Sequence, residues 1–323
     1  MRLSPRMMII ACAGALAAGL AAGCSAAPGA AYTTGATHAP NAAAAKASAS
    51  PSRTAPVGPV LTVSGAPAGV AAKEAILADA ATGQVLFSRN PGVPRPMASI
   101  TKVMTAYLVI QAGNLDRTVT VPKGVINYVF KYGGESGGTH AGEKLTARDL
   151  LYDLLLQSGA DASFTLATVY GPGMSTFIAR MNATARQLGM DHTHFTSPDG
   201  LPYPTEFSTY STPSDLLILG EAAMKLPAFR SIVDQIQFHV PKGPGHSEHF
   251  WDNDDSLLQT YKGAIGIKTG FTDLAGHCLL FEAIRNGRPL IGVVLDSPAT
   301  GFRASEDDAT RILNWGFSLK QEG

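Results

Sequence analysis

Ser99 and Lys102 form a Ser-x-x-Lys pair close to the start of a predicted helix. Residues three apart on a helix lie on the same face, so the serine hydroxyl and the lysine amine are expected to be neighbours. A serine hydroxyl is a weak nucleophile until a base takes its proton, and a lysine can be that base when its pKa is lowered. The pair predicts a nucleophile with its general base, although a surface serine and a solvated lysine would show the same spacing.

Two later features favour the catalytic interpretation. Lys268, Thr269 and Gly270 are expected to end a strand, where the lysine and the threonine would offer a cation and a hydroxyl to an anion. Gly270 would let a substrate backbone approach closely. Ser158 ends a leucine-rich helix and supplies a second hydroxyl from a separate element. Together these residues predict a site for nucleophilic catalysis on an anionic substrate.

Hydrophobic periodicity and turn signals predict the elements that must position these residues. Strands are predicted at 75–79, 84–88, 263–269, 276–284 and 289–296. Helices are predicted at 97–113, 146–158, 161–170, 174–188, 212–225 and 305–317. Strands that bracket a helical insert predict an α+β fold, in which a largely antiparallel sheet is flanked by helices and carries a mostly helical inserted subdomain.

Local signals support several of these boundaries. Thr146 and Thr212 each open a helix in a capping-box sequence, and Pro213 occupies the tolerated first helical position. Asn286-Gly287 is a strong signal for a hairpin turn between the last two strands. The predicted body is therefore a sheet made from both ends of the folded region, with helices between.

The three motifs belong to a larger pattern. Ser-x-x-Lys, a serine-centred second motif and Lys-Thr-Gly occur together in penicillin-binding proteins and β-lactamases. Over roughly residues 71–320 the chain resembles the D-alanyl-D-alanine carboxypeptidases, which are low-molecular-mass penicillin-binding proteins. The segments that carry the resemblance are Ala80–Phe87, Ala98–Thr105, Gly142–Leu145, Leu154–Gly159, Gly266–Thr272 and Asn314–Phe317. The resemblance implies a β-lactamase/transpeptidase-like fold.

The resemblance also implies an activity. Ser99 would be acylated by a peptidoglycan stem peptide ending in D-Ala-D-Ala, which would release the terminal D-Ala, and water would hydrolyse the acyl-enzyme. Lys102 would be the general base, and Ser158 and Lys268 would relay protons to the leaving amine. β-Lactams would be covalent inhibitors. No cofactor or metal is implied.

Further residues would hold the substrate. Lys268 and Thr269 would bind the substrate carboxylate, and Arg303 would assist. Backbone N–H groups of Ser99 and Phe271 would form the oxyanion hole. These roles come from the resemblance and are expectations.

Two segments depart from the pattern of these peptidases. Ala160 stands where the second motif, Ser-Gly-Asn, has its Asn. Ser197-Pro-Asp-Gly-Leu201 stands where these peptidases commonly have Asn-Pro-His-Gly-Leu. A lost hydrogen bond of the Asn kind is worth on the order of 1–3 kcal/mol. The segment 197–201 is interpreted as a structural turn. Ala160 leaves open a catalytically weak lipoprotein that binds peptidoglycan or penicillin.

Two enzymatic alternatives use the same chemistry. A DD-endopeptidase that cuts peptidoglycan cross-links fits the motifs equally well. A class A β-lactamase would need an additional Glu that activates the deacylating water, and no matching Glu-x-x-Leu-Asn segment lies between Ser158 and Lys268. The carboxypeptidase is the preferred prediction.

The N-terminal segment predicts export. Arg2 and Arg6 precede an apolar run that ends at Gly23-Cys24, as in a secretory signal with a lipobox-like cleavage site. We expect residues 1–23 to be a lipoprotein signal peptide, 24–71 a flexible Ala/Ser/Pro/Thr tether lipidated on Cys24, and 72–323 the DD-peptidase catalytic domain. The protein would sit on the outer face of the cytoplasmic membrane; plain secretion is the alternative.

Composition excludes other classes. The chain has 323 residues with 25 Lys+Arg and 25 Asp+Glu, so it lacks the basic excess of a nucleic-acid-binding protein. A hydrophobic fraction of 45% excludes a disordered chain. A metal site is one interpretation of His246, His249, Asp252, Asp254 and Asp255, but a solvated polar loop is preferred. Cys278 is expected to be a buried small residue.

Overall fold

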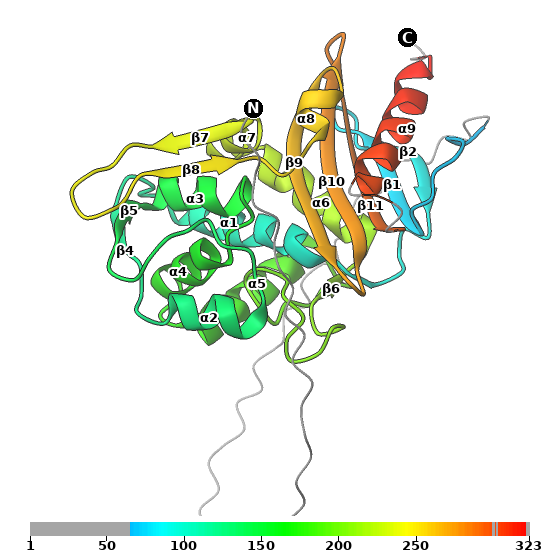
Figure 1. The fold of residues 1–323 in the computed structure, drawn as a ribbon. Coiled ribbons are helices and arrows are strands. Elements are labelled where there is room, and N and C mark those ends of the chain that lie inside the picture. The colour runs from blue at the N-terminus through cyan, green and yellow to red at the C-terminus, as the bar shows by residue number, and fades with distance from the viewer. Residues whose placement is uncertain (1–64, 299–300, 302, 321–323) are drawn as a thin grey trace, which may run out of the picture. The chain divides into compact units, whose positions relative to one another are not determined.

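The sheet of the body joins the two ends of the folded chain. The computed structural model describes residues 65–298, 301 and 303–320. Five antiparallel strands lie in the order β2-β1-β11-β10-β9 (Figure 1). They are β1 (Glu74–Asp79), β2 (Gln84–Arg89), β9 (Ala264–Thr272), β10 (Gly276–Arg285) and β11 (Arg288–Ser297). The first strand therefore pairs with the last one. The predicted leader and most of the predicted tether, including Cys24, lie outside the described residues. The end of the predicted tether contacts the body, because Val70 is buried and Ala71 N donates to Asp308.

Turn chemistry fixes the register of the last two strands. Asn286 and Gly287 have φ of 51° and 79°, the left-handed values that a two-residue hairpin turn requires. The predicted strands are confirmed, but β9 continues through Thr272 instead of ending at 269. The pairs Gly270↔Cys278 and Thr272↔Gly276 carry the ladder past the Lys-Thr-Gly motif, which lies inside the strand.

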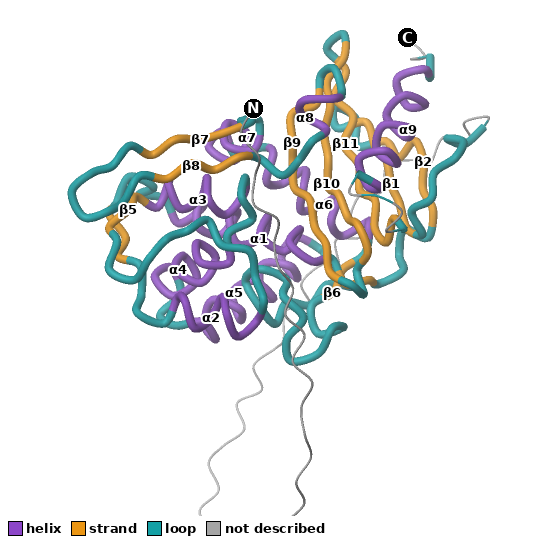
Figure 2. The backbone as a smooth tube through the Cα atoms, viewed as in Figure 1, coloured by secondary structure: helices purple, strands orange, loops and turns teal. Residues whose placement is uncertain are grey.

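Helices cover both faces of this sheet. Helix α9 (Ala304–Ser318) packs on one face, and α6 (Pro213–Met224) packs on the other (Figures 1 and 2). Residues of β11 alternate accordingly, with Val294 in the cluster beneath α9 and Val293 in the larger cluster beneath α6. The α+β class with a helical insert between β2 and β9 is confirmed.

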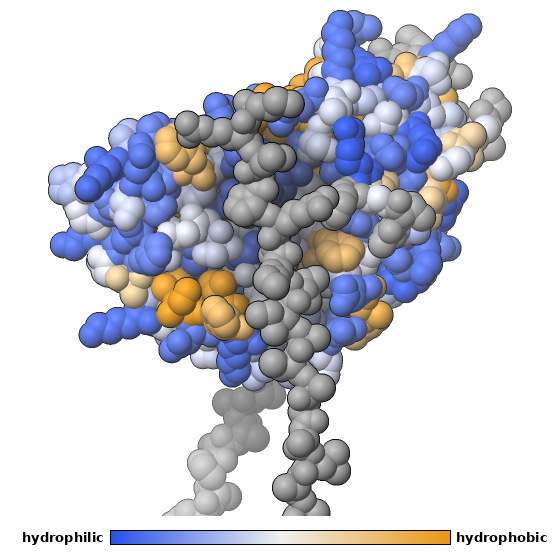
Figure 3. All heavy atoms as spheres, viewed as in Figure 1, coloured by the Kyte–Doolittle hydropathy of each residue, from blue (hydrophilic) through white to orange (hydrophobic). Residues whose placement is uncertain are grey.

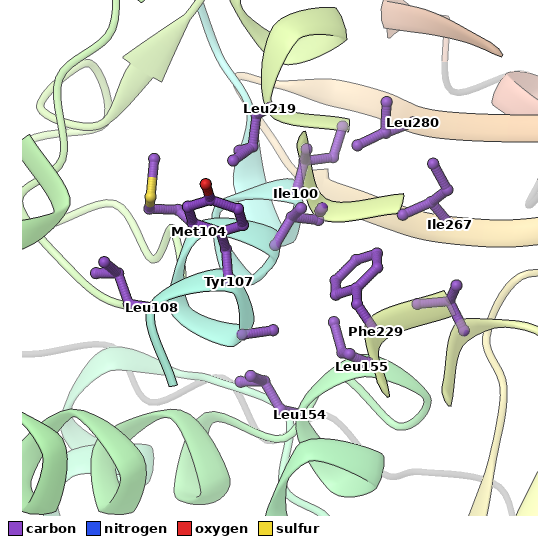
Figure 4. Close-up of a cluster of buried hydrophobic side chains, with 14 of the residues drawn as sticks. Ile100, Met104, Tyr107, Leu108, Leu154, Leu155, Leu219, Phe229, Ile267 and Leu280 are labelled. Atoms are coloured by element: carbon purple, nitrogen blue, oxygen red, sulfur yellow. The ribbon is translucent and has the colours of Figure 1, made fainter. Parts of the chain in front are cut away.

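A buried helix organises the insert. A 3-10 turn, Ala98–Thr101, leads into α1 (Lys102–Ala112), whose residues 102–109 are all buried. Side chains from α1, α3 (Ala147–Leu155), α6, α7 (Pro227–Val233), β9 and β10 meet in one cluster (Figure 4). The remaining larger helices of the described insert are α2 (Val125–Tyr132), α4 (Ala160–Tyr170) and α5 (Met174–Leu188). The helix that carries Lys102 is thus enclosed by the elements around it.

Capping decides where two helices start. Thr146 accepts a hydrogen bond from the Asp149 N–H, and Asp149 accepts one from the Thr146 N–H, so the predicted capping box of α3 is present. Thr212 caps α6 through the Asp215 N–H. The Asp215 carboxylate binds His192 N and Thr193 Oγ1, so the reciprocal half of that box is not formed.

The expectation of a solvated polar loop around His246 and His249 is wrong in part. The strands β7 (Gln237–Val240) and β8 (His249–Asp252) form a hairpin, and His249 is buried. The Phe238 ring stacks on Tyr152 of α3, which places this hairpin on the helical insert. Periodicity also missed the helices α2 and α7 and several shorter elements: β3 (Arg95–Pro96), β4 (Thr118–Thr120), β5 (Lys144–Thr146), β6 (Tyr210–Ser211) and α8 (Leu257–Thr260).

The outer surface is mostly hydrophilic in the view of Figure 3. Hydrophobic side chains gather over α2, where Ile126 and Phe130 are exposed. Within residues 65–298, 301 and 303–320, no helix combines the length and apolar character needed to cross a membrane.

Asp308 joins the start of the described body to its last helix. Its carboxylate accepts hydrogen bonds from Ala71 N at 2.8 Å, Ala72 N at 2.7 Å and Ser297 Oγ at 2.8 Å. The residue is 1% exposed. Removing it would leave buried donors without an acceptor.

We expect Asp308→Ala to lower the free energy of unfolding by about 3 kcal/mol, measured by urea denaturation. Asp116→Ala is the matched control, because Asp116 pairs with Arg148 at the surface, whereas the buried Asp308 pairs with Arg311. The control should leave unfolding nearly unchanged. Equal effects of the two substitutions would contradict this role of Asp308.

Candidate active site

Ser99 and Lys102 are in hydrogen-bond contact. The Lys102 Nζ donates to Ser99 Oγ over 2.9 Å. Ser99 lies in the 3-10 turn that precedes α1, and Lys102 is the first residue of α1. Ala98 has φ of 47°, a strained value for a residue with a side chain, directly before the serine. The predicted nucleophile–base pair is therefore assembled.

Burial makes the neutral, proton-accepting form of Lys102 more available. Lys102 is 2% exposed, and desolvation lowers its pKa to about 8. The charge of Asp199 opposes this shift, and the charge of Lys268 adds to it. Lys102 Nζ also donates to the backbone carbonyl of Asp199 over 3.2 Å. The segment 197–201, interpreted from sequence as a structural turn, thus reaches the site.

Strand β9 brings Lys268, Thr269 and Gly270 against the nucleophile turn. A methyl group at Gly270 would lie 2.9 Å from the Met97 carbonyl oxygen and 3.1 Å from the Ser99 nitrogen. In the structure Gly270 lets the nucleophile turn approach the strand closely, and its role toward a substrate backbone stays a prediction. Lys268 is 1% exposed, and its Nζ donates to Thr269 Oγ1 over 3.2 Å. Burial lowers the Lys268 pKa, against the charges of nearby carboxylates.

The second motif forms the turn between α3 and α4. Ser158 is buried with φ of 63°, so its backbone is held in a left-handed conformation. Ala160 has no exposed surface; its N–H donates to the Glu135 carbonyl, and its methyl lies beneath Gly134. The position that carries Asn in the family pattern is covered by residues 133–135 in this chain.

Asp161, the next residue, holds that covering loop. Its carboxylate accepts hydrogen bonds from Ser136 Oγ, Gly137 N and Thr139, both N and Oγ1. The loop is therefore anchored to the start of α4, beside the second motif.

A cavity of about 760 Å³ opens between the sheet and the helical insert. It brings together most of the predicted site residues, namely Ser99, Lys102, Ser158, Thr269, Gly270 and Phe271. Arg303 does not belong to its described lining, because the guanidinium donates to Thr260 Oγ1 over 2.8 Å. A role for Arg303 in carboxylate binding stays a prediction.

Sequence patterns missed the acidic side chains of the site. Glu135 and Asp254 line the cavity, and burial raises the pKa of both carboxyl groups. Each also favours the charged forms of Lys102 and Lys268. Glu135 follows the α2 helix and Asp254 follows β8, two elements without a clear sequence signal.

One buried acid lies behind the cavity. Asp153 is fully buried, and neither carboxyl oxygen has a hydrogen-bond partner among the described residues. Burial and the neighbouring Asp161 raise the pKa of Asp153 well above the usual range, which favours its neutral form. A methyl group on Gly137 or Gly159 would overlap Asp153 Oδ1, which explains why both positions are glycine.

A buried histidine lies against a buried carboxylate away from the cavity. His249 Nε2 is 3.3 Å from Glu143 Oε2, where β8 meets the 140–143 turn. Across residues 65–298, 301 and 303–320, no group of three or more His, Cys, Asp and Glu side chains is arranged to hold a metal ion. Cys278 is buried, as expected, and burial raises its pKa to about 12.

Gly200 provides a test of the nucleophile turn. It has φ of 83°, and a methyl group there would overlap the Ala98 carbonyl oxygen. Gly189 has nearly the same φ, 84°, with nothing within 4 Å of a methyl group. Both Ala substitutions should cost about 1 kcal/mol of stability through backbone strain.

We expect only Gly200→Ala to slow Ser99 acylation by a fluorescent penicillin, on the order of 100-fold, because it displaces the turn that holds the nucleophile. Gly189→Ala is the matched control. A Gly200→Ala protein that acylates at the control's rate would contradict the contact between the two turns.

Known proteins share this architecture. Residues 61–299 match the family model of the D-alanyl-D-alanine carboxypeptidases, peptidase family S11. A D-alanyl-D-alanine carboxypeptidase of Streptomyces sp. strain K15 is 39% identical over 250 residues, which are 74% of this chain and 84% of that protein. A D-alanyl-D-alanine endopeptidase of Pseudomonas aeruginosa is 34% identical over 249 residues, 76% of this chain and 77% of that protein.

The fold agrees as well. The crystal structure of the Streptomyces K15 DD-transpeptidase has a TM-score of 0.74 and 37% identity, and the match covers 79% of this chain and 100% of that one. The resemblance inferred from the motifs is thereby confirmed. The chain belongs to the D-alanyl-D-alanine carboxypeptidase family of serine peptidases.

Proposed function

We propose that this protein is a serine-type D-Ala-D-Ala carboxypeptidase that removes the terminal D-Ala from peptidoglycan stem peptides. The observation that carries the proposal is the 2.9 Å contact between Ser99 Oγ and the buried Lys102 Nζ, at the wall of a cavity shared with the Lys-Thr-Gly strand. Family membership supports the substrate class.

In the first step, Ser99 Oγ attacks the carbonyl carbon of the penultimate D-Ala. Neutral Lys102 takes the hydroxyl proton, and the resulting oxyanion is held by the N–H groups of Ser99 and Phe271. Lys268 and Thr269 bind the terminal carboxylate. This geometry requires Lys102 to be neutral while Lys268 is charged.

Collapse of the tetrahedral intermediate breaks the C–N bond. The proton on Lys102 passes through the Ser158 hydroxyl to the leaving amine, and free D-Ala departs. Water then attacks the ester carbonyl on Ser99, which releases the shortened peptide and restores the serine. Ser158 lines the cavity beside Ser99 and Lys102, as this relay needs.

Two alternatives retain specific support. A DD-endopeptidase is supported by the P. aeruginosa relative, which bears that name. A weak penicillin- or peptidoglycan-binding protein is motivated by Ala160, whose methyl group cannot replace the hydrogen bonds of an amide. Release of D-Ala from monomeric and from cross-linked muropeptides separates the first alternative from the carboxypeptidase.

The wild-type protein should be labelled covalently by a fluorescent penicillin and should release D-Ala from a pentapeptide, and Ser99→Ala should abolish both. Retained folding of the variant, measured by circular dichroism, is the control. A wild-type protein that is not labelled would contradict the enzymatic proposal. Labelling without release of D-Ala would favour a catalytically weak penicillin- or peptidoglycan-binding protein.

The rate of Ser99 acylation should rise with pH. Lys102 must lose its proton, and its pKa is about 8, so the base fraction should increase roughly fivefold between about pH 7 and about pH 8. The rate should fall again at higher pH, when Lys268 loses the charge that holds the carboxylate. A rate that is flat across this range would contradict Lys102 as the base.

We further propose that the protein is exported and anchored through Cys24. The support is the signal-like sequence before that residue. Cys24→Ala should move the protein from the membrane fraction to the soluble exported fraction and abolish incorporation of labelled palmitate. A variant that stays in the membrane fraction would refute lipid anchoring.

A further inference from the structure

We propose that Asp199 is a positioning residue that holds Lys102 in place and sets the pH above which Lys102 can act as a base. The inference rests on the proposed function and deepens it. It goes beyond the motifs, which contain no acidic residue at this place.

Asp199 contacts Lys102 through its backbone carbonyl, and the negative charge of its side chain favours the Lys102 ammonium form. The backbone carbonyl accepts the Lys102 ammonium hydrogen bond at 3.2 Å. The carboxylate accepts hydrogen bonds from Tyr128 Oη at 2.8 Å and from Leu201 N at 3.2 Å. Since Asp199 has no exposed surface, solvent cannot screen this charge.

The turn that carries Asp199 cannot shift independently of the nucleophile. One turn of α1 beyond Lys102, Thr105 Oγ1 donates to the Pro198 carbonyl over 2.6 Å. Gly200 N donates to Ser197 Oγ, and the Gly200 Cα lies against the Ala98 carbonyl. Lys102 and Thr105 thus bind two consecutive carbonyl groups, which fixes the carboxylate relative to the base.

Asp199 is the strongest of the charges that act on Lys102. Glu135 and Asp254 also favour the ammonium form, but both are exposed to the cavity, where solvent weakens them. Lys268 is the one cation among the charges acting on Lys102 in the described chain, and it favours the neutral amine. The balance between desolvation, Lys268 and Asp199 therefore decides when Lys102 loses its proton.

The residue type at 199 decides whether this site adds a charge. Asp brings an enclosed negative charge to the base, and a neutral side chain would bring none. An enclosed negative charge retains the Lys102 proton to higher pH. The inference is that this chain acylates best under more alkaline conditions than it would with a neutral side chain at 199.

The experiment measures the second-order rate constant for acylation of Ser99 by a fluorescent penicillin from about pH 5.5 to about pH 10, on the full-length protein. Asp199→Asn should move the acid limb of the profile at least about half a pH unit lower, so that the variant is about threefold faster at the acid end. Tyr128→Phe removes a hydrogen bond that the Asp199 carboxylate accepts. The carboxylate charge should then act more strongly on Lys102, which should move the acid limb of the profile to higher pH.

Asp215→Asn is the matched control, because Asp215 is another buried, hydrogen-bonded carboxylate and is not among the charges that act on Lys102. It should lower thermal stability without moving the limb. A purely structural role of Asp199 would lower the rate at every pH and leave the limb in place, which would overturn the proposal.

A second readout does not depend on turnover. The 13Cε signal of Lys102 in protein with labelled lysine, assigned by a Lys102→Arg variant, should titrate at lower pH in Asp199→Asn than in the wild type. An unchanged titration would refute the inference about Asp199 while wild-type labelling by penicillin still stands. Failure of the wild type to be labelled would instead refute the proposed function.

Discussion

The burial of two lysine ammonium groups in one place is the constraint on which the rest of the site depends. Lys102 is 2% exposed and Lys268 is 1% exposed, and an isolated buried charge is strongly unfavourable. Two like charges add repulsion. Enclosed and cavity-facing carboxylates partly offset the desolvation that lowers the pKa of both lysines.

The fold supplies these carboxylates from distant segments because the site lies where the sheet meets the helical insert. Asp199 comes from the turn after α5, Glu135 from the loop after α2 and Asp254 from the end of β8. Glycines allow these segments to approach one another. Gly270 lets β9 lie against the nucleophile turn, and Gly200 lets the turn that carries Asp199 lie against the same nucleophile turn. The close packing of backbone on backbone is what holds Ser99 in its strained turn.

Sequence reasoning succeeded where the signal is local. The capping box at Thr146, the Asn286-Gly287 turn and the pairing of Ser99 with Lys102 depend on residues within a few positions of one another. It failed where the cause lies far along the chain. The hydrogen bond between Tyr128 and Asp199 spans 71 positions, and the contact of Gly270 with Ser99 depends on how the sheet docks. The β7–β8 hairpin gave no periodic signal because its sequence is largely polar. Its apolar contacts are few: Phe238 stacks on Tyr152 and on Trp251.

The pairing of the first strand with the last one has a kinetic consequence. Ala72 and Asp308 are hydrogen-bonded across 236 positions, and β1 lies between β2 and β11. The sheet therefore cannot complete its centre until β11 has been synthesised, and the early hairpin must wait with an open edge. Such non-local closure makes folding slow and leaves the early strands prone to wrong association. A chain that ends before β11 would carry the whole catalytic pair and still lack the strand that joins β1 to the rest of the sheet.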